Sequence, residues 1–131
     1  MPSKFPPHIR LGKKGENIAI SFLEAKGFRI LACNFKFKKA EVDIIAKRDQ
    51  RLSFVEVKTR TGKGFTRAEN SINKTKQHLY FLAAQEYCKK EAISCLIQFD
   101  EIVIELFAYG KDLFYFPDSF YPNPENTLKD K

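Results

Sequence analysis

The sequence predicts an α/β fold, because two segments of helical character alternate with segments of strand character. Apolar side chains recur at three- and four-residue spacing in residues 13–26 and again before residue 90, which is the spacing of amphipathic helices. Between these segments lie two short β-branched runs separated by a charged break, a pattern typical of a β-hairpin. Two more strand-like runs follow the second helix. By pattern alone, the order is helix, hairpin, helix and strands.

The length and composition of the chain predict a single domain. With 131 residues, of which 44% are hydrophobic and 30% charged, the chain resembles an ordinary globular protein. We predict a flexible arm over the proline-rich residues 1–10, the domain over 11–116 and an irregular tail over 117–131. No apolar run reaches the ~18 residues of a membrane span, and the N-terminus lacks the apolar core of a signal peptide. We therefore expect a cytoplasmic protein with no membrane partner.

The first helix, predicted over residues 13–26, carries an acid near its start. Its apolar stripe is followed by Gly27, the residue type that commonly stops a helix. Glu16 borders the stripe. It is either a first-turn acid stabilised by the helix dipole or a metal ligand, and its position alone leaves both interpretations open. A strand is expected next, over residues 28–37.

The central hairpin concentrates the chemistry. Its strands are expected over residues 42–46 and 52–58. Symmetric pairing about the charged break places Asp43 opposite Glu56 and Glu41 opposite Lys58. Directly opposed side chains lie about 4.5–5.5 Å apart at Cβ, so two carboxylates there repel one another unless a cation joins them. The pattern therefore predicts a divalent metal site with a lysine one step along the same face.

The rest of the chain completes the predicted architecture. A basic, glycine-containing loop is expected over residues 59–67, followed by a helix that ends near Lys90. Thr66 with Glu69 forms a candidate capping box, and Asn70 or Ser71 is an alternative cap. The apolar stripe of this helix consists of Ile72, Leu79, Leu82 and Ala83. Strands are expected over 95–107, which carries Asp100, and over 112–116.

Cysteine and histidine content excludes several kinds of site. The three cysteines are odd in number and lack Cys-x-x-Cys spacing, which argues against a disulfide framework or a zinc knuckle and fits a reducing compartment. His8 and His78 are the only histidines, and neither stands in a context typical of a Ser-His-Asp unit.

Charge is distributed unevenly along the chain. The formal net charge is +7, and the first 90 residues hold 20 Lys/Arg against 8 Asp/Glu. This asymmetry favours a polyanionic partner, most simply the phosphates of nucleic acid. A basic protein without such a partner is the alternative. The candidate nucleic-acid-binding residues are Lys38, Lys39, Arg60, Lys63, Arg67, Lys76 and Gln77.

An Asp on one strand followed by Glu-x-Lys on the next resembles the active-site signature of the PD-(D/E)XK nuclease superfamily. Here Asp43, Glu56 and Lys58 carry it. A longer ordered set resembles the YraN family of uncharacterised, endonuclease-like bacterial proteins. It consists of Leu11-Gly12, Gly15-Glu16, Ala19, Gly27-Phe28, Asn34, AEVDIIA, FVEVKTR, Lys76-Gln77 and Phe99-Asp100.

This resemblance implies a restriction-endonuclease-like fold, with a central mixed sheet flanked by two helices, and a metal-dependent endonuclease activity. It implies a Mg²⁺ or Mn²⁺ ion held by Asp43, Glu56, the carbonyl of Val57 and Glu16. Lys58 would steady the attacking hydroxide and the charge that develops at phosphorus.

The substrate and the class of function stay open at this point. A similarity to archaeal Holliday junction resolvases favours DNA over RNA, suggests repair or recombination structures, and leaves a homodimer open. Two alternatives to an enzyme are a non-catalytic nucleic-acid-binding module that retains the nuclease fold and an adaptor for a protein partner.

Overall fold

The computed structural model describes residues 7–62 and 72–121, and the predicted α/β fold is confirmed within them. The elements are α1 (Pro7–Ala25), β1 (Arg29–Phe37), β2 (Ala40–Arg48), β3 (Arg51–Thr61), α2 (Lys74–Lys90), β4 (Leu96–Phe107) and β5 (Gly110–Phe116). No helix in the described ranges is both long and apolar enough to cross a membrane.

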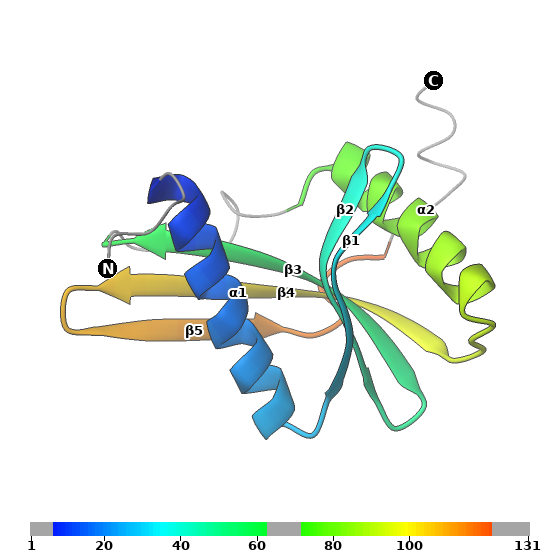
Figure 1. The fold of residues 1–131 in the computed structure, drawn as a ribbon, viewed down its shortest axis with the longest axis horizontal. Helices are drawn as coiled ribbons and strands as arrows, with labels where there is room; N and C mark the ends of the chain where they lie inside the picture. Colours follow the sequence, from blue (N-terminus) through cyan, green and yellow to red (C-terminus); the bar gives the residue numbers. More distant parts are fainter. Residues whose placement is uncertain (1–6, 63–71, 122–131) are drawn as a thin grey trace.

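The five strands form one mixed sheet in the order β1-β2-β3-β4-β5. Every neighbouring pair is antiparallel except β3 and β4, which are parallel. Parallel neighbours require a crossover connection, and α2 lies in the one between β3 and β4 (Figure 1). The predicted mixed sheet with two helices is therefore present.

The two helices cover opposite faces of this sheet (Figure 1). Ala19 and Leu23 of α1 belong to one apolar cluster, which includes Ile44 and Val55. The neighbouring residues Ile45 and Phe54 belong to the other, formed with α2 side chains such as Tyr80, Ala83 and Tyr87. Consecutive strand residues point to opposite faces, so the central strands are buried on both sides.

Helix α1 begins at Pro7, six residues before the predicted start, so residues 7–10 of the predicted arm are helical. The predicted stop is confirmed, because the helix ends at Ala25 and Gly27 adopts a φ of +91°. A β-carbon at Gly15 would collide with the side chain of Thr59 on β3. Helix and strand therefore meet closely at the residue before Glu16.

The register predicted for the central hairpin is confirmed, but the ladder is shorter than expected. Its last pair toward the open end is Ile44 with Val55. The predicted pairs of Asp43 with Glu56 and of Glu41 with Lys58 lie beyond this end and are absent from the ladder. On its other side, Glu41 pairs with Lys36 of β1.

The cause is a break in strand regularity around Asp43. β1 pairs Cys33 with Ile44 and Phe35 with Val42 in one continuous register, but the pair between them, Asn34 with Asp43, is absent from the ladder, and Asn34 has a φ of +53°. Val42 and Ile45, three residues apart, consequently contribute to the same apolar cluster. The β1–β2 hairpin thus bends away from β3 at Asp43.

The predicted loop after the hairpin begins too early. β3 continues to Thr61, so Arg60 lies on a strand. Helix α2 begins at Lys74 with Asn73 as its N-cap, whose side chain accepts a 2.8 Å hydrogen bond from the Lys76 backbone N–H. The candidate caps Thr66, Glu69, Asn70 and Ser71 lie outside the described residues, and the helix starts after all of them.

The chain after β5 returns to the α2 side of the sheet. Residues 117–121 are irregular, as predicted. Phe120 is nevertheless buried, with its ring centroid 5.8 Å from that of Tyr80 and 5.3 Å from that of Phe99. The first residues of the predicted tail therefore belong to the core.

Candidate functional site

Asp43 lies at the fork where β2 leaves β3. The backbone N–H of Val57, two residues beyond the last ladder pair, donates a 2.8 Å hydrogen bond to Asp43 Oδ2. The Asp43 carboxylate thus accepts the hydrogen bond of a β3 backbone N–H that no longer has a backbone partner on β2, because β2 diverges here. The same bond fixes the Asp43 side chain against β3.

Glu56 lies on β3, directly before Val57, and only 5% of its surface is exposed. Both of its carboxylate oxygens are bound by side chains of α2. Lys76 Nζ is 2.6 Å from Oε1, and the Tyr80 hydroxyl donates a 2.7 Å hydrogen bond to Oε2. Helix α2 therefore neutralises and orients this acid.

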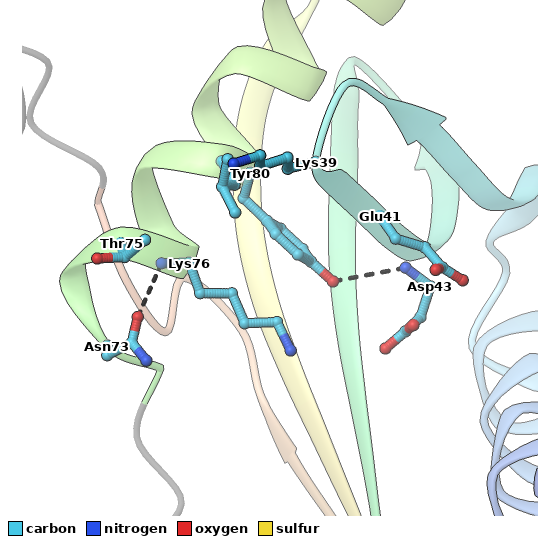
Figure 2. Close-up of a pocket in the computed structure, with 8 residues that line it drawn as sticks. Lys39, Glu41, Asp43, Asn73, Thr75, Lys76 and Tyr80 are labelled. Carbon is cyan, nitrogen blue, oxygen red and sulfur yellow. Dashed lines mark hydrogen bonds between the residues drawn. The ribbon is translucent and has the colours of Figure 1, made fainter.

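Tyr80 joins the two acids. Its hydroxyl oxygen accepts a 3.4 Å hydrogen bond from the Asp43 backbone N–H (Figure 2). Burial, followed by the negative charge of Glu56, raises the pKa of Tyr80 well above its ordinary value, so the phenol stays neutral and donates. Sequence reasoning missed this residue. Its only signal was its position in the helical stripe that continues to Ala83 and Tyr87.

The acids repel each other despite these contacts. Burial, and next the charge of Glu56, raises the pKa of Asp43 from 3.8 to about 7, while the Val57 hydrogen bond and Lys76 act in the opposite direction. In the metal-free protein, Asp43 therefore holds its proton for a large part of the time near neutral pH. A cation shared by Asp43 and Glu56 would remove this repulsion.

Glu16 approaches the same region from α1. Its Oε1 accepts a 3.1 Å hydrogen bond from the side-chain amide of Asn34, which lies opposite Asp43 in the β1–β2 register. Burial raises the pKa of Glu16, and the Asn34 hydrogen bond opposes this effect. The charge of Glu16 also raises the pKa of Asp43. The structure thus brings a third acid near the predicted pair.

Lys58 follows Glu56 on β3 with one residue between them. Burial lowers the pKa of Lys58, while the charges of Glu101 and Glu56 oppose this effect. Glu101 is buried on β4 and lies beside Glu56 in the parallel register. Glu56 and Lys58 therefore lie on β3 just beyond the end of the β2–β3 ladder, where the Val57 N–H between them contacts Asp43.

A cleft of about 400 Å³ opens beside these acids, between β2 and the first turns of α2. Lys39, Glu41 and Asp43 line it on the strand side, and Lys76 and Tyr80 line it on the helix side, with Asn73, Thr75 and Leu79 (Figure 2). The cleft lining therefore combines two lysines with two acids, Glu41 and Asp43, whereas Glu56 lies behind Lys76 and Tyr80 as their buried partner.

The predicted nucleic-acid-binding residues separate into different positions. Lys39 lines the cleft, Lys38 lies in the β1–β2 turn, and Arg60 is exposed on β3. Lys76 pairs with Glu56, and the Gln77 amide donates a 3.0 Å hydrogen bond to the Ile72 carbonyl. The remaining two candidates, Lys63 and Arg67, lie outside the described residues.

The donor set fits a hard cation that keeps most of its water ligands. In the described ranges, no three Asp, Glu, His or Cys side chains gather closely enough to hold a metal ion as they stand. Mg²⁺ commonly binds proteins through only one or two carboxylates. Asp43 and Glu56 can supply these, since Asp43 contacts the backbone N–H of Val57, the residue directly after Glu56. Glu56 must first release a partner on α2.

Residues 15–104 match the uncharacterised protein family UPF0102. The chain belongs to this family. It is 37% identical over 114 residues to a UPF0102 protein of Flavobacterium psychrophilum, covering 87% of this chain and 96% of that protein. It is 42% identical over 103 residues to a UPF0102 protein of Caldicellulosiruptor saccharolyticus, covering 78% and 86%. The UPF0102 match spans every residue of the site described above.

Proposed function

We propose that this UPF0102 protein is a metal-dependent phosphodiester hydrolase that acts on nucleic acid. The observation that carries the proposal is the pair of repelling acids, Asp43 and Glu56, placed where β2 and β3 diverge, with Lys58 nearby. Membership of the YraN type and of the PD-(D/E)XK superfamily, with a restriction-endonuclease-like fold, is part of this proposal. The mixed sheet with a helix on each face is consistent with it.

Each residue has a chemical role in this scheme. Asp43 and Glu56 would hold Mg²⁺ or Mn²⁺, and the Val57 carbonyl and Glu16 are proposed to complete the site. The ion would polarise the phosphate and lower the pKa of a bound water. Lys58 supplies positive charge where negative charge develops at phosphorus.

Nucleic acid is the proposed substrate because Asp43 lines a cleft whose walls also include Lys39 and Lys76. DNA is favoured over RNA, with branched repair or recombination structures as candidates, and a homodimer and a cytoplasmic location belong to the same proposal.

If phosphate contacts drive binding, log K should fall linearly with log salt, by about 0.9 for each neutralised phosphate of duplex DNA. Affinity that does not change with salt would contradict a phosphate-binding surface.

The direct test is cleavage. End-labelled single-stranded, duplex and branched DNA, and matched RNA, are incubated with the protein and Mn²⁺ or Mg²⁺. We expect cleavage that requires metal, stops in chelator and disappears in Asp43→Asn. Asp49→Asn is the charge-matched control, since Asp49 is exposed in the turn of the same hairpin. Absence of cleavage of every substrate by the metal-loaded wild type would remove the enzymatic proposal.

The ion pair between Lys76 and Glu56 favours a second candidate, a non-catalytic nucleic-acid-binding module. A site whose glutamate is already neutralised within the chain does not require a metal to fold. In that case the protein would bind nucleic acid with the same affinity in chelator and in Mn²⁺, and it would cleave none.

A further inference from the structure

Lys76 places a cation on one of the two acids that the proposed function assigns to a metal. Its Nζ is 2.6 Å from Glu56 Oε1, and its charge also acts favourably on Asp43. Figure 2 shows the lysine side chain extending from the first turn of α2 into the space beside Asp43 and Tyr80. A positive group therefore already stands at the acid pair.

The two α2 partners of Glu56 differ in their freedom to leave. The Tyr80 side chain is only 1% exposed, its hydroxyl also contacts the Asp43 N–H, and its ring packs on Phe120. The Lys76 side chain is 44% exposed, against 6% for Glu56. A half-exposed lysine on a flexible stem that lines a cleft can turn into solvent without disturbing the core. The tyrosine cannot.

We infer that Lys76 and a divalent metal compete for Glu56. Lys76 neutralises the glutamate while no metal is bound, and it turns out into the cleft when the ion enters. This inference rests on the proposed function, because it takes the metal site of that proposal as given. It accounts for a fold that tolerates two neighbouring acids without an ion, and it assigns Tyr80 as the positioning residue that holds Glu56 through the exchange.

The test measures metal affinity in place of activity. Lys76→Met removes the ammonium group and keeps most of the stem, and Mn²⁺ binding to the full chain is measured by titration calorimetry. Lys74→Met is the matched control, because Lys74 is exposed on the same turn of α2. We expect Lys76→Met to bind Mn²⁺ about tenfold more tightly than wild type, the ratio that corresponds to one charge-assisted hydrogen bond. Lys74→Met should stay within about twofold of wild type, because distant exposed charges are screened.

The possible results distinguish the competition between Lys76 and the metal from the existence of the metal site itself. Wild-type binding that Lys76→Met leaves unchanged or weakens would overturn the competition and leave the metal site standing. Binding by Lys76→Met alone would support competition in its strongest form. No binding by either protein would overturn both. Lys76→Gln guards against misfolding, since its amide can still donate to Glu56. It should also bind Mn²⁺ more tightly than wild type, and a value equal to wild type would count against the inference.

Discussion

Two aspartates of the same sheet occupy opposite kinds of surroundings. Asp100, fully buried on β4, accepts hydrogen bonds from the Tyr115 hydroxyl at 2.9 Å, the Asp118 N–H at 2.9 Å and the Gln98 amide at 3.2 Å. Asp43, on β2, accepts a hydrogen bond from the Val57 N–H, and after burial the charge of another acid, Glu56, has the largest effect on its pKa.

This difference shows that burial alone does not identify a functional acid. Burial is the largest cause that raises the pKa of both residues. At Asp100, the hydrogen bonds all oppose that effect. At Asp43, the charge of Glu56 adds to it. A buried carboxylate surrounded by donors fastens β5 and the chain after it to β4, whereas a carboxylate that faces another carboxylate is suited to a cation.

The largest expected effect is on the cleavage rate and concerns Lys58, which belongs to the same proposed site as Asp43. Lys58→Ala should lower the cleavage rate by about 10²–10³-fold, the usual cost of losing one group that stabilises transition-state charge. Substrate affinity should stay within a few-fold, because the lysine acts mainly in the transition state. Single-turnover cleavage and equilibrium binding measure the two quantities. Lys111→Ala, on exposed β5, is the control. Equal cleavage by Lys58→Ala and wild type would show that Lys58 has another role.

The pH dependence of stability gives the next effect. In the metal-free protein, the pKa of Asp43 is raised from 3.8 to about 7. Between about pH 4 and pH 7 the folded chain keeps a proton that the unfolded chain has lost, so stability falls as pH rises, by at most about 1.4 kcal/mol per unit. Urea unfolding in chelator should show this fall in wild type relative to Asp43→Asn. A difference between the two proteins that does not change with pH would contradict it.

Asp100→Asn should act on the fold alone. Replacing one acceptor oxygen by an NH₂ group sets a donor against the donors of Tyr115, Gln98 or Asp118. We expect a loss of about 1–3 kcal/mol in unfolding free energy, measured by urea denaturation. The stabilisation by Mn²⁺ should be the same as in wild type. If the metal response disappears, Asp100 belongs to the site and the comparison fails.

The features that could be predicted from the sequence are those that depend on local residue patterns. The charged break between two β-branched runs was enough to predict the hairpin register, which brought Asp43 and Glu56 near each other. The end of the ladder at Ile44 could not be predicted in this way, because it coincides with the unformed β1–β2 pair of Asn34 and Asp43. The register across the hairpin itself carries no information about a third strand.

The contacts that α2 makes with Glu56 also could not be predicted from local residue patterns. Asn73 caps the helix, but Asn70 and Ser71 are equally good caps by residue type. Tyr80 looks like any other member of an apolar stripe until α2 docks on β3 and brings its hydroxyl to Glu56. Lys76 likewise looked like a surface cation, although its ammonium group meets an almost fully buried glutamate.

Thermal melts of wild type and Asp43→Asn, each in chelator and in Mn²⁺, test whether Asp43 and Glu56 form a cation site. A ligand that binds only the folded state stabilises it by about 2.7 kcal/mol at one hundred times its Kd. We predict that Mn²⁺ stabilises wild type. We also predict that Asp43→Asn is at least as stable as wild type in chelator at neutral pH, and that Mn²⁺ has almost no effect on the mutant. A mutant that is less stable in chelator, yet responds to Mn²⁺ as wild type does, would make Asp43 a structural residue like Asp100 and contradict the claim.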